Sequence, residues 1–166
     1  MPDETITFFY RAYDKRYGFL SQWYISPFLD EKGVLYNCAE QYMMAEKARL
    51  FCDVESEKKI LLEQNPMKQK QLGRNVEGFN QKMWEKQRYS IVKKGNRFKF
   101  QQNPNLMRRL LQTSGRIAEA SPSDKIWGIG MAQSSSGVWD PYNWKGENLL
   151  GNILTSLRDE FRTQVD

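Results

Sequence analysis

The amino-acid sequence predicts an α+β fold that is predominantly helical, with a few short strands, in a single compact domain over residues 1–166. A chain of 166 residues has the length of one domain and can bury a core without a metal or a disulfide. Apolar residues recur at helical spacing from about residue 37 onward, whereas β-rich segments are short and lie near the N-terminus. No internal repeat, long linker or low-complexity tract suggests a domain boundary.

The strands are expected before residue 37. The segment TITFFY, residues 5–10, is rich in β-branched and aromatic residues and is predicted as a strand. The aromatic segment RYGFLSQWYISPF, residues 16–28, follows as a loop. A hairpin or turn is predicted around residues 30–33, because Asp and Gly are common turn residues.

Three helices are predicted between residues 37 and 73. Asn37, followed three residues later by Glu40, resembles a capping box and opens a helix that continues to about Phe51. Asp53 is expected to cap a second helix over residues 54–64. Pro66 suits the first turn of a short third helix that ends near residue 73.

Three further helices are predicted toward the C-terminus. Residues 79–94 form the fourth, which Gly95 is expected to close, and Pro104 opens the fifth. The last helix covers residues 147–162 and carries apolar residues at the spacing of a core-facing stripe. These residues are Leu149, Leu150, Ile153, Leu154, Leu157 and Phe161.

A long irregular region, residues 114–146, is expected before the last helix. It contains the Trp-rich stretch IWGIGMAQSSSGVWDPYNWKG, residues 126–146. Loops of this length inside a domain are usually functional or disordered. Three tryptophans argue against disorder, because disordered segments are poor in aromatic residues.

The absence of histidine restricts the chemistry more than any other compositional feature. Without histidine, Ser-His and Cys-His nucleophile pairs and the usual His-containing zinc sites are excluded, so no metal is expected. Cys38 and Cys52 would lie about 21 Å apart on the predicted helix and are expected to be free thiols. Free thiols, no signal peptide and no membrane-spanning apolar run predict a cytoplasmic or nuclear protein that is not secreted.

The net charge of +5 favours anionic partners such as phosphates. The densest basic cluster is KKGNRFKF, residues 93–100, in which basic and aromatic residues alternate. This pattern is typical either of a solvated helix end or of a surface that binds single-stranded nucleic acid.

Glu40 and Lys47 stand out on the first predicted helix. At 100° per residue they lie about 20° apart, at the centre of the apolar arc, whereas Gln41, Ala45 and Arg49 fall on the opposite side. Two helical turns separate them by about 10.5 Å, which suits a ligand bound between them better than a direct ion pair. Two interpretations without a ligand are also possible: Glu40 completes the helix cap, and Lys47 extends its ammonium to water.

Trp84 and Asp140 also have both a functional and a purely structural interpretation. Trp84 could stack on a base or pack in the core. Asp140, which precedes Pro141, is most simply a turn former.

Six segments follow one another in a recognisable order: YGFLSQWYISPF, NCAEQYMMAEKA, PMKQKQLGR, QKMWEKQRYSIVKKGNRFKFQQNP, IWGIG and WDPYNWKGENLLG. Each segment alone is a weak signal. Together, over nearly the whole chain, they resemble the NADAR family, also called the YbiA-like superfamily. The resemblance implies a YbiA-like domain and an N-glycosidase without a cofactor.

The resemblance also implies the substrate. Most directly it predicts removal of ADP-ribose from guanine bases, in a nucleotide or in ADP-ribosylated DNA or RNA. The alternative substrate is a phosphorylated intermediate of riboflavin biosynthesis, a phosphoribosyl nucleotide. An alternative of another class is a non-catalytic module that binds ADP-ribose or nucleic acid. No membrane or metal partner is implied.

Site residues follow from the same resemblance. Glu40 corresponds to the family's key acidic residue and Lys47 to a lysine on the same helix; Asp140 is a second candidate carboxylate. Glu40 is expected to stabilise the cationic sugar or activate water, and Lys47 to donate a proton or form a Schiff base. The expected substrate-binding residues are Gln22, Trp23, Arg74, Trp84, Trp127, Gly128 and Asn148.

Two departures from the family pattern affect these assignments. Ile129 occupies a position where some members have Asp in a WGDG loop, so the acidic role is expected to pass to Asp140. The aromatic loop has Ser21, Gln22 and Trp23 where SNF is common.

Overall fold

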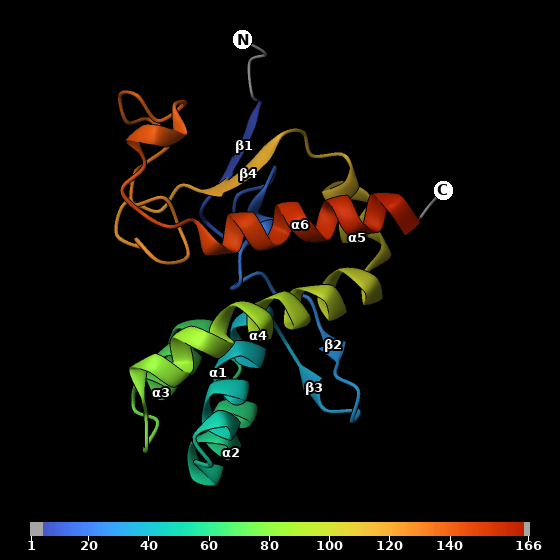
Figure 1. Ribbon diagram of the computed structural model, residues 1–166. Coiled ribbons are helices and arrows are strands. Elements are labelled where there is room, and N and C mark those ends of the chain that lie inside the picture. Colours follow the sequence, from blue (N-terminus) through green and yellow to red (C-terminus); the bar gives the residue numbers. More distant parts are fainter. Residues whose placement is uncertain (1–4, 165–166) are drawn as a thin grey trace. The chain divides into compact units, whose positions relative to one another are not determined.

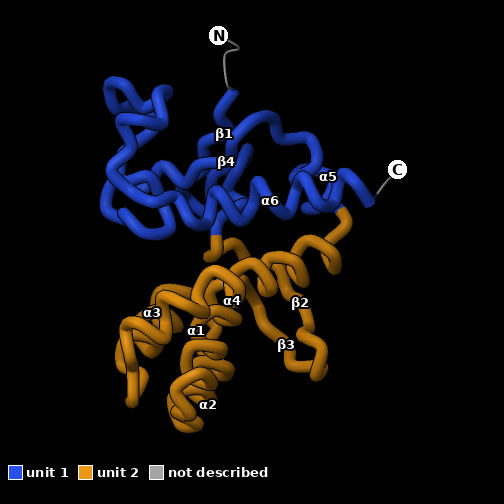
Figure 2. Tube along the Cα trace, in the orientation of Figure 1, with its two compact units in different colours: residues 1–21, 105–166 blue, residues 22–104 orange. Residues whose placement is uncertain are grey.

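The computed structural model describes residues 5–164 and confirms an α+β fold that is predominantly helical (Figure 1). The chain divides into two compact units (Figure 2). Unit 1 comprises residues 1–21 and 105–166, and unit 2 comprises the continuous segment 22–104. This division does not test the single domain expected over residues 1–166, which stays a prediction.

Unit 2 is built around one central helix. This helix, α1 (Ala39–Leu50), packs against α2 (Val54–Leu62), α3 (Pro66–Arg74) and α4 (Gln81–Gln102). The short strands β2 (Phe28–Leu29) and β3 (Leu35–Tyr36) form the predicted antiparallel hairpin. Because three helices enclose α1, the expectation that Gln41 and Ala45 face away from the core is wrong, and both are buried.

Two of the predicted helix starts in unit 2 are confirmed by their caps. The Asp53 carboxylate accepts a hydrogen bond from the backbone N–H of Ser56 at 3.0 Å, which satisfies a free donor of the first turn of α2. Asn65 caps α3 through the N–H of Met67, and Pro66 occupies the first turn, where its missing N–H costs nothing.

The start of α1 differs from the predicted capping box. The helix begins one residue after Cys38, and the Asn37 side chain donates to the Gln64 carbonyl rather than capping α1. The Gln41 carboxamide oxygen accepts from the Asn37 N–H at 2.7 Å, so Gln41 supplies the reciprocal contact expected of Glu40. Gln41 also donates to the carbonyls of Ile60 and Glu63 and thereby ties α1 to the end of α2.

The fourth helix is longer than predicted, because α4 continues through Gly95 to Gln102. A Cβ at position 95 would overlap the ring of Tyr42 on α1. The glycine therefore permits a close approach of two helices and does not end one.

Residues 93–100 are neither a solvated helix end nor an exposed basic surface. Lys99 and Phe100 are fully buried, and the Phe98 ring packs against those of Phe28 and Tyr42. Lys94 is half-exposed and pairs with Glu31 at 2.7 Å. The predicted single-strand binding surface is therefore not formed by this segment.

Burial of Lys99 gives the stability of the fold a pH dependence. Desolvation lowers the pKa of Lys99 to about 7, although the nearby Cys38 thiol acts in the opposite direction. An unfolded lysine has a pKa of about 10.4, so from pH 7 upward the unfolded chain binds more protons than the folded chain. The free energy of unfolding contributed by Lys99 therefore rises with pH across this window and is flat below it.

We expect the wild type to gain about 1–2 kcal/mol of unfolding free energy relative to Lys99→Met between pH 7 and 8.5. Urea unfolding of both proteins at each pH measures this difference. Burial raises the pKa of Cys38 to about 12, although the Lys99 charge acts in the opposite direction, and this lowers stability only above about pH 8.5, outside the compared range. A difference that did not change with pH would contradict the buried titration.

Unit 1 is organised by a pair of parallel strands. Strand β1 (Ile6–Phe9), predicted from TITFFY, pairs with β4 (Arg116–Glu119), and α6 (Leu149–Gln164) packs on β4. The sequence did not predict β4, which lies in the region expected to be irregular. Helix α5 (Pro104–Leu111) begins at the predicted proline. The core contains Ile6, Phe8, Ala118, Ala120, Ile129, Met131 and Val138.

The Trp-rich stretch of unit 1 packs on this core. The Trp144 indole N–H donates to the Val138 carbonyl at 2.8 Å, and Trp139 meets Phe8 edge to face with ring centres 5.0 Å apart. A 3-10 turn, η2 (Pro141–Asn143), interrupts the stretch, and another, η1 (Gly18–Leu20), lies in the N-terminal aromatic segment.

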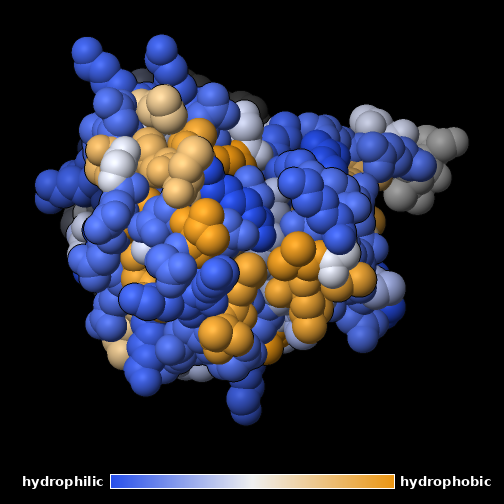
Figure 3. Space-filling model, turned by 90° about the horizontal axis from the view of Figure 1, so that it is seen from below, coloured by the Kyte–Doolittle hydropathy of each residue, from blue (hydrophilic) through white to orange (hydrophobic). Residues whose placement is uncertain are grey.

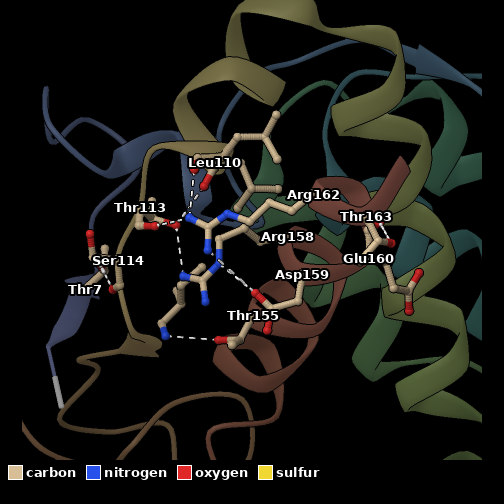
Figure 4. Close-up of polar contacts among 12 residues, drawn as sticks. Thr7, Leu110, Thr113, Ser114, Thr155, Arg158, Asp159, Glu160, Arg162 and Thr163 are labelled. Atoms are coloured by element: carbon tan, nitrogen blue, oxygen red, sulfur yellow. Dashed lines mark hydrogen bonds and ion pairs between the residues drawn. The ribbon is translucent and has the colours of Figure 1, made fainter. Parts of the chain in front are cut away.

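Two arginines fasten α6 to the connection between α5 and β4 (Figure 4). The buried Arg158 guanidinium donates to the Thr113 hydroxyl and pairs with Asp159 at 3.1 Å. Arg162 donates to the carbonyl of Leu111, the last residue of α5, at 2.8 Å and to that of Thr113 at 2.6 Å. These contacts fix the residue that leads into β4.

Candidate active site

Glu40 lies in the first turn of α1 and is 3% exposed. Its backbone N–H donates to the carbonyl oxygen of Gln22 at 2.9 Å, so the aromatic loop is attached directly to the start of the helix. A buried carboxylate that does not cap the helix is a candidate catalytic group. Burial of a charge is unfavourable, and buried ionisable groups are therefore concentrated at functional sites.

Lys47 lies two turns further along α1 and is half-buried. Its ammonium nitrogen is 4.7 Å from the ring centre of Phe79 and 5.5 Å from that of Trp84, within the range of cation–π attraction. Desolvation lowers the pKa of Lys47, the charge of Glu40 opposes this shift, and Arg74 adds to it.

Arg74 and Trp84 are positioned by the packing of α3 and α4 on α1. Gly73 lies against the Met44 side chain, where a Cβ would overlap the sulfur, so α3 can approach α1 closely just before Arg74. Trp84 is buried in the first turn of α4, beside Lys47. The alternative of a core tryptophan and that of a stacking residue are both compatible with this position.

Gln22 and Trp23 come from the loop that precedes β2. The Gln22 side chain is buried, and its carboxamide oxygen accepts from Asn96 Nδ2 at 2.8 Å. Trp23 is partly exposed, and the Lys70 ammonium lies 6.0 Å from its ring centre. Patches of apolar surface interrupt the hydrophilic face shown in Figure 3. The exposed apolar side chains of unit 2 include Trp23, Phe79 and Met83.

The remaining predicted residues belong to unit 1. Asp140 is exposed and caps η2 by accepting from the Tyr142 N–H at 3.0 Å, which confirms its turn-forming role. Trp127 is half-buried, and Gly128 leaves no room for a Cβ beside the Glu119 carbonyl. The buried Asn148 carboxamide bridges the Ile117 carbonyl and the Glu119 N–H, so it holds β4 in place.

The structure thus brings six predicted residues into unit 2 and four into unit 1. Glu40, Lys47 and Arg74 interact electrostatically, and Trp84 contacts Lys47. Two cavities of about 470 and 450 Å³ lie within unit 1, and neither is lined by Glu40 or Lys47. Catalytic roles for Glu40, Lys47 and Asp140 stay predictions.

Residues 5–164 contain neither a metal-binding cluster nor a membrane-spanning helix. This part of the chain contains no group of three or more Cys, Asp or Glu side chains placed to hold a metal ion. It also contains no helix that is long and apolar enough to cross a membrane.

Sequence reasoning missed two residues near these side chains. Phe79 contacts Lys47 from the segment between α3 and α4, and no local pattern distinguishes it from other loop aromatics. Asn96 contacts Gln22 from the middle of α4. A buried Asn after Gly95 would have signalled this contact only if the helix had been predicted to continue.

Comparisons with known proteins agree with the resemblance. The family model for the NADAR domain matches residues 8–162. N-glycosidase R617 of Acanthamoeba polyphaga mimivirus is 44% identical over 167 residues, covering 96% of this chain and 98% of that protein. N-glycosidase YbiA of Escherichia coli (strain K12) is 29% identical, covering 95% of this chain and 89% of that protein.

The fold is similar to a solved structure of the same group. The NMR structure of the E. coli protein YbiA matches with a TM-score of 0.79 and 28% identity, covering 99% of this chain and 89% of that one. A riboflavin biosynthesis protein of Vibrio vulnificus is 28% identical over 93% of this chain, which spans 38% of that longer protein. This chain is accordingly an enzyme that hydrolyses N-glycosyl compounds, and it belongs to the NADAR domain family.

Proposed function

We propose that this enzyme removes ADP-ribose from guanine bases by hydrolysing the bond between ribose C1 and a base nitrogen. The observation that carries the proposal is the electrostatic group on one helix: a buried Glu40, the partly desolvated Lys47 ammonium and the nearby Arg74. A carboxylate suits the positive charge that develops on the sugar, the Lys47 ammonium can protonate the leaving base, and the Arg74 guanidinium suits the phosphates of the substrate. The net charge of +5 favours such an anionic ligand.

The reaction breaks one bond and consumes one water. As the C1–N bond lengthens, Glu40 stabilises the cationic sugar carbon or takes a proton from the attacking water, whose oxygen becomes the new hydroxyl on C1. The bonding electrons leave with the base nitrogen, which acquires a proton. Lys47 donates that proton, and its lowered pKa makes it a better acid near neutral pH than an exposed lysine.

Aromatic and polar residues would hold the substrate around these groups. Trp84 and Trp23 offer ring faces for a base or sugar, and Arg74 offers a planar donor fork for a phosphate. Trp127, Gly128 and Asp140 belong to unit 1, and the substrate-binding and catalytic roles expected of them stay predictions. The Asn148 carboxamide supports β4, so its contribution to binding is indirect.

The proposal is tested by product analysis. The purified protein is incubated with ADP-ribosylated guanosine, and free ADP-ribose is quantified by liquid chromatography with mass spectrometry. We expect release of ADP-ribose and unmodified guanosine in equal amounts. Binding of ADP-ribose without any release would favour the non-catalytic module instead.

A second substrate class is supported by the similarity to the Vibrio riboflavin biosynthesis protein. It predicts hydrolysis of a phosphorylated riboflavin intermediate, in which a phosphoribosyl group is joined to nitrogen. Parallel incubations with both substrates decide by the ratio of kcat/KM. A higher value for the riboflavin intermediate would overturn the assignment to ADP-ribosyl guanine and leave N-glycoside hydrolysis intact.

Lys47→Arg is expected to lower kcat at least about tenfold, because a guanidinium does not release its proton in the accessible pH range. In the wild type, kcat should fall at alkaline pH through a limb below the ordinary lysine pKa of about 10.4, since burial lowers the pKa of Lys47. The variant should lack this limb. Lys82→Arg, at an exposed position of α4, is the matched control. A covalent adduct trapped by borohydride would contradict the proton-donor role and indicate a Schiff base.

A further inference from the structure

We propose that Asn96 is a positioning residue that fixes the Gln22 carboxamide, so that Gln22 Nε2 donates a hydrogen bond to an acceptor oxygen of the substrate beside Glu40. The inference deepens the proposed function and rests on it. All three residues belong to unit 2.

The starting observation is a buried amide with an unused donor. Gln22 is 8% exposed and Asn96 is fully buried. Within residues 5–164, neither Gln22 Nε2 nor Asn96 Oδ1 has a hydrogen-bond partner. A buried polar atom without a partner is costly, and native proteins retain such atoms mainly where a ligand, water or function uses them.

The orientation of both amides follows from a helix carbonyl. Asn96 Nδ2 donates to the Val92 carbonyl at 2.9 Å and to Gln22 Oε1 at 2.8 Å. Reversing the Asn96 amide would place its oxygen against the Val92 oxygen, and reversing Gln22 would place two donors against each other. The only arrangement with matched partners therefore leaves Gln22 Nε2 as a buried donor without a partner among residues 5–164.

The location of this donor is set by the backbone. The Gln22 carbonyl accepts from the N–H of Glu40, so the same residue that carries the donor also joins the start of α1. Asn96 reaches this loop because Gly95 lets α4 approach Tyr42 on α1 without a steric conflict. Three separate elements thus converge on the end of α1 that holds the candidate carboxylate.

The chemistry of the two ends of α1 then differs. Lys47, about two turns from Glu40, is the proposed proton donor to the base, and the nearby Arg74 suits the phosphates. A neutral amide donor beside a carboxylate suits an uncharged acceptor, either a ribose hydroxyl oxygen or a carbonyl oxygen of the base. Gln22 is therefore expected to donate a hydrogen bond to the ribose or the base of the substrate.

A double-mutant cycle tests whether Asn96 acts through Gln22. We expect Gln22→Ala and Asn96→Ala each to lower kcat/KM for ADP-ribosyl guanosine about tenfold, and the double variant to lose no more than either single variant. An additive loss, about a hundredfold, would overturn the inference. Asn103→Ala is the control, because Asn103, the residue that follows α4, also donates to two carbonyls, those of Lys99 and Pro27, but not to Gln22.

A near-isosteric variant covers the case in which Asn96→Ala does not fold. Gln22→Glu keeps an oxygen to accept from Asn96 but replaces the Nε2 donor with a second oxygen. The second buried carboxylate is expected to lower the unfolding midpoint, so kcat/KM is measured below that midpoint, where we expect it to fall about tenfold or more. Unchanged kcat/KM in this variant would also overturn the inference.

Failure of the proposed function gives a different result. If the wild type released no ADP-ribose, the same cycle would be measured as affinity for free ADP-ribose by calorimetry. Non-additive losses of affinity would support the role of Asn96 in a binding module. Additive losses, or no ADP-ribose binding by the wild type, would overturn it.

Discussion

Replacing Glu40 with glutamine is expected to lower kcat/KM by about 10²–10⁴-fold. Glutamine keeps the shape of the side chain and fits the same buried position at the start of α1. It removes the negative charge that would stabilise a cationic sugar and the basic oxygen that would activate water. The measurement is steady-state release of ADP-ribose from ADP-ribosyl guanosine, together with calorimetric binding of ADP-ribose.

The matched control is Glu46→Gln, which makes the same chemical change on the same helix. Glu46 pairs with Arg49 at 2.8 Å and is partly exposed, so a small loss of stability is expected but near-normal turnover. Affinity for ADP-ribose should also survive in Glu40→Gln. Turnover of Glu40→Gln within a few-fold of the wild type on both substrate classes would refute the assignment of Glu40.

Gly95→Ala should destabilise the folded protein by about 1–3 kcal/mol, although alanine is intrinsically the better helix former by about 1 kcal/mol. The added methyl group would overlap the Tyr42 ring. That ring cannot move easily, because the rings of Tyr36 and Phe28 pack against it with centres 5.0 and 6.0 Å away. Urea unfolding, followed by the change in midpoint at constant slope, measures the effect.

Ser90→Ala provides the comparison for Gly95→Ala, because Ser90 is exposed on the same helix. Its unfolding free energy should stay equal to that of the wild type or rise slightly. If Gly95→Ala were as stable as Ser90→Ala, the close approach of α4 to α1 at this glycine would not exist.

Local signals predicted three of the six helix starts in residues 5–164 correctly, those of α2, α3 and α5. Asp53 and Pro66 act within one turn of chain, so their effect is visible in a few consecutive residues. Gly95 was misread because its role depends on Tyr42, more than fifty positions earlier, which a local pattern does not reveal. Strand β4 was missed for the same reason, since its four residues acquire strand geometry by pairing with β1.

The candidate site was predictable to a similar extent. Helical periodicity alone placed Glu40 and Lys47 on one face, and their electrostatic interaction agrees with that placement. The contribution of Gln22 followed only from the family resemblance, and its partner Asn96 was not foreseen. Contacts between a loop and the middle of a distant helix leave no periodic trace in the sequence.

The parallel pairing of β1 with β4 has a consequence for biosynthesis. Ile6 on β1 is the register partner of Arg116 on β4. The complete segment 22–104 therefore emerges from the ribosome before β1 can pair with β4. That segment can fold before β4 is synthesised. During this time the hydrogen-bonding edge of the apolar strand β1 stays unpaired. Nascent chains are thus most exposed to chaperones and to aggregation in the interval before β4 is translated.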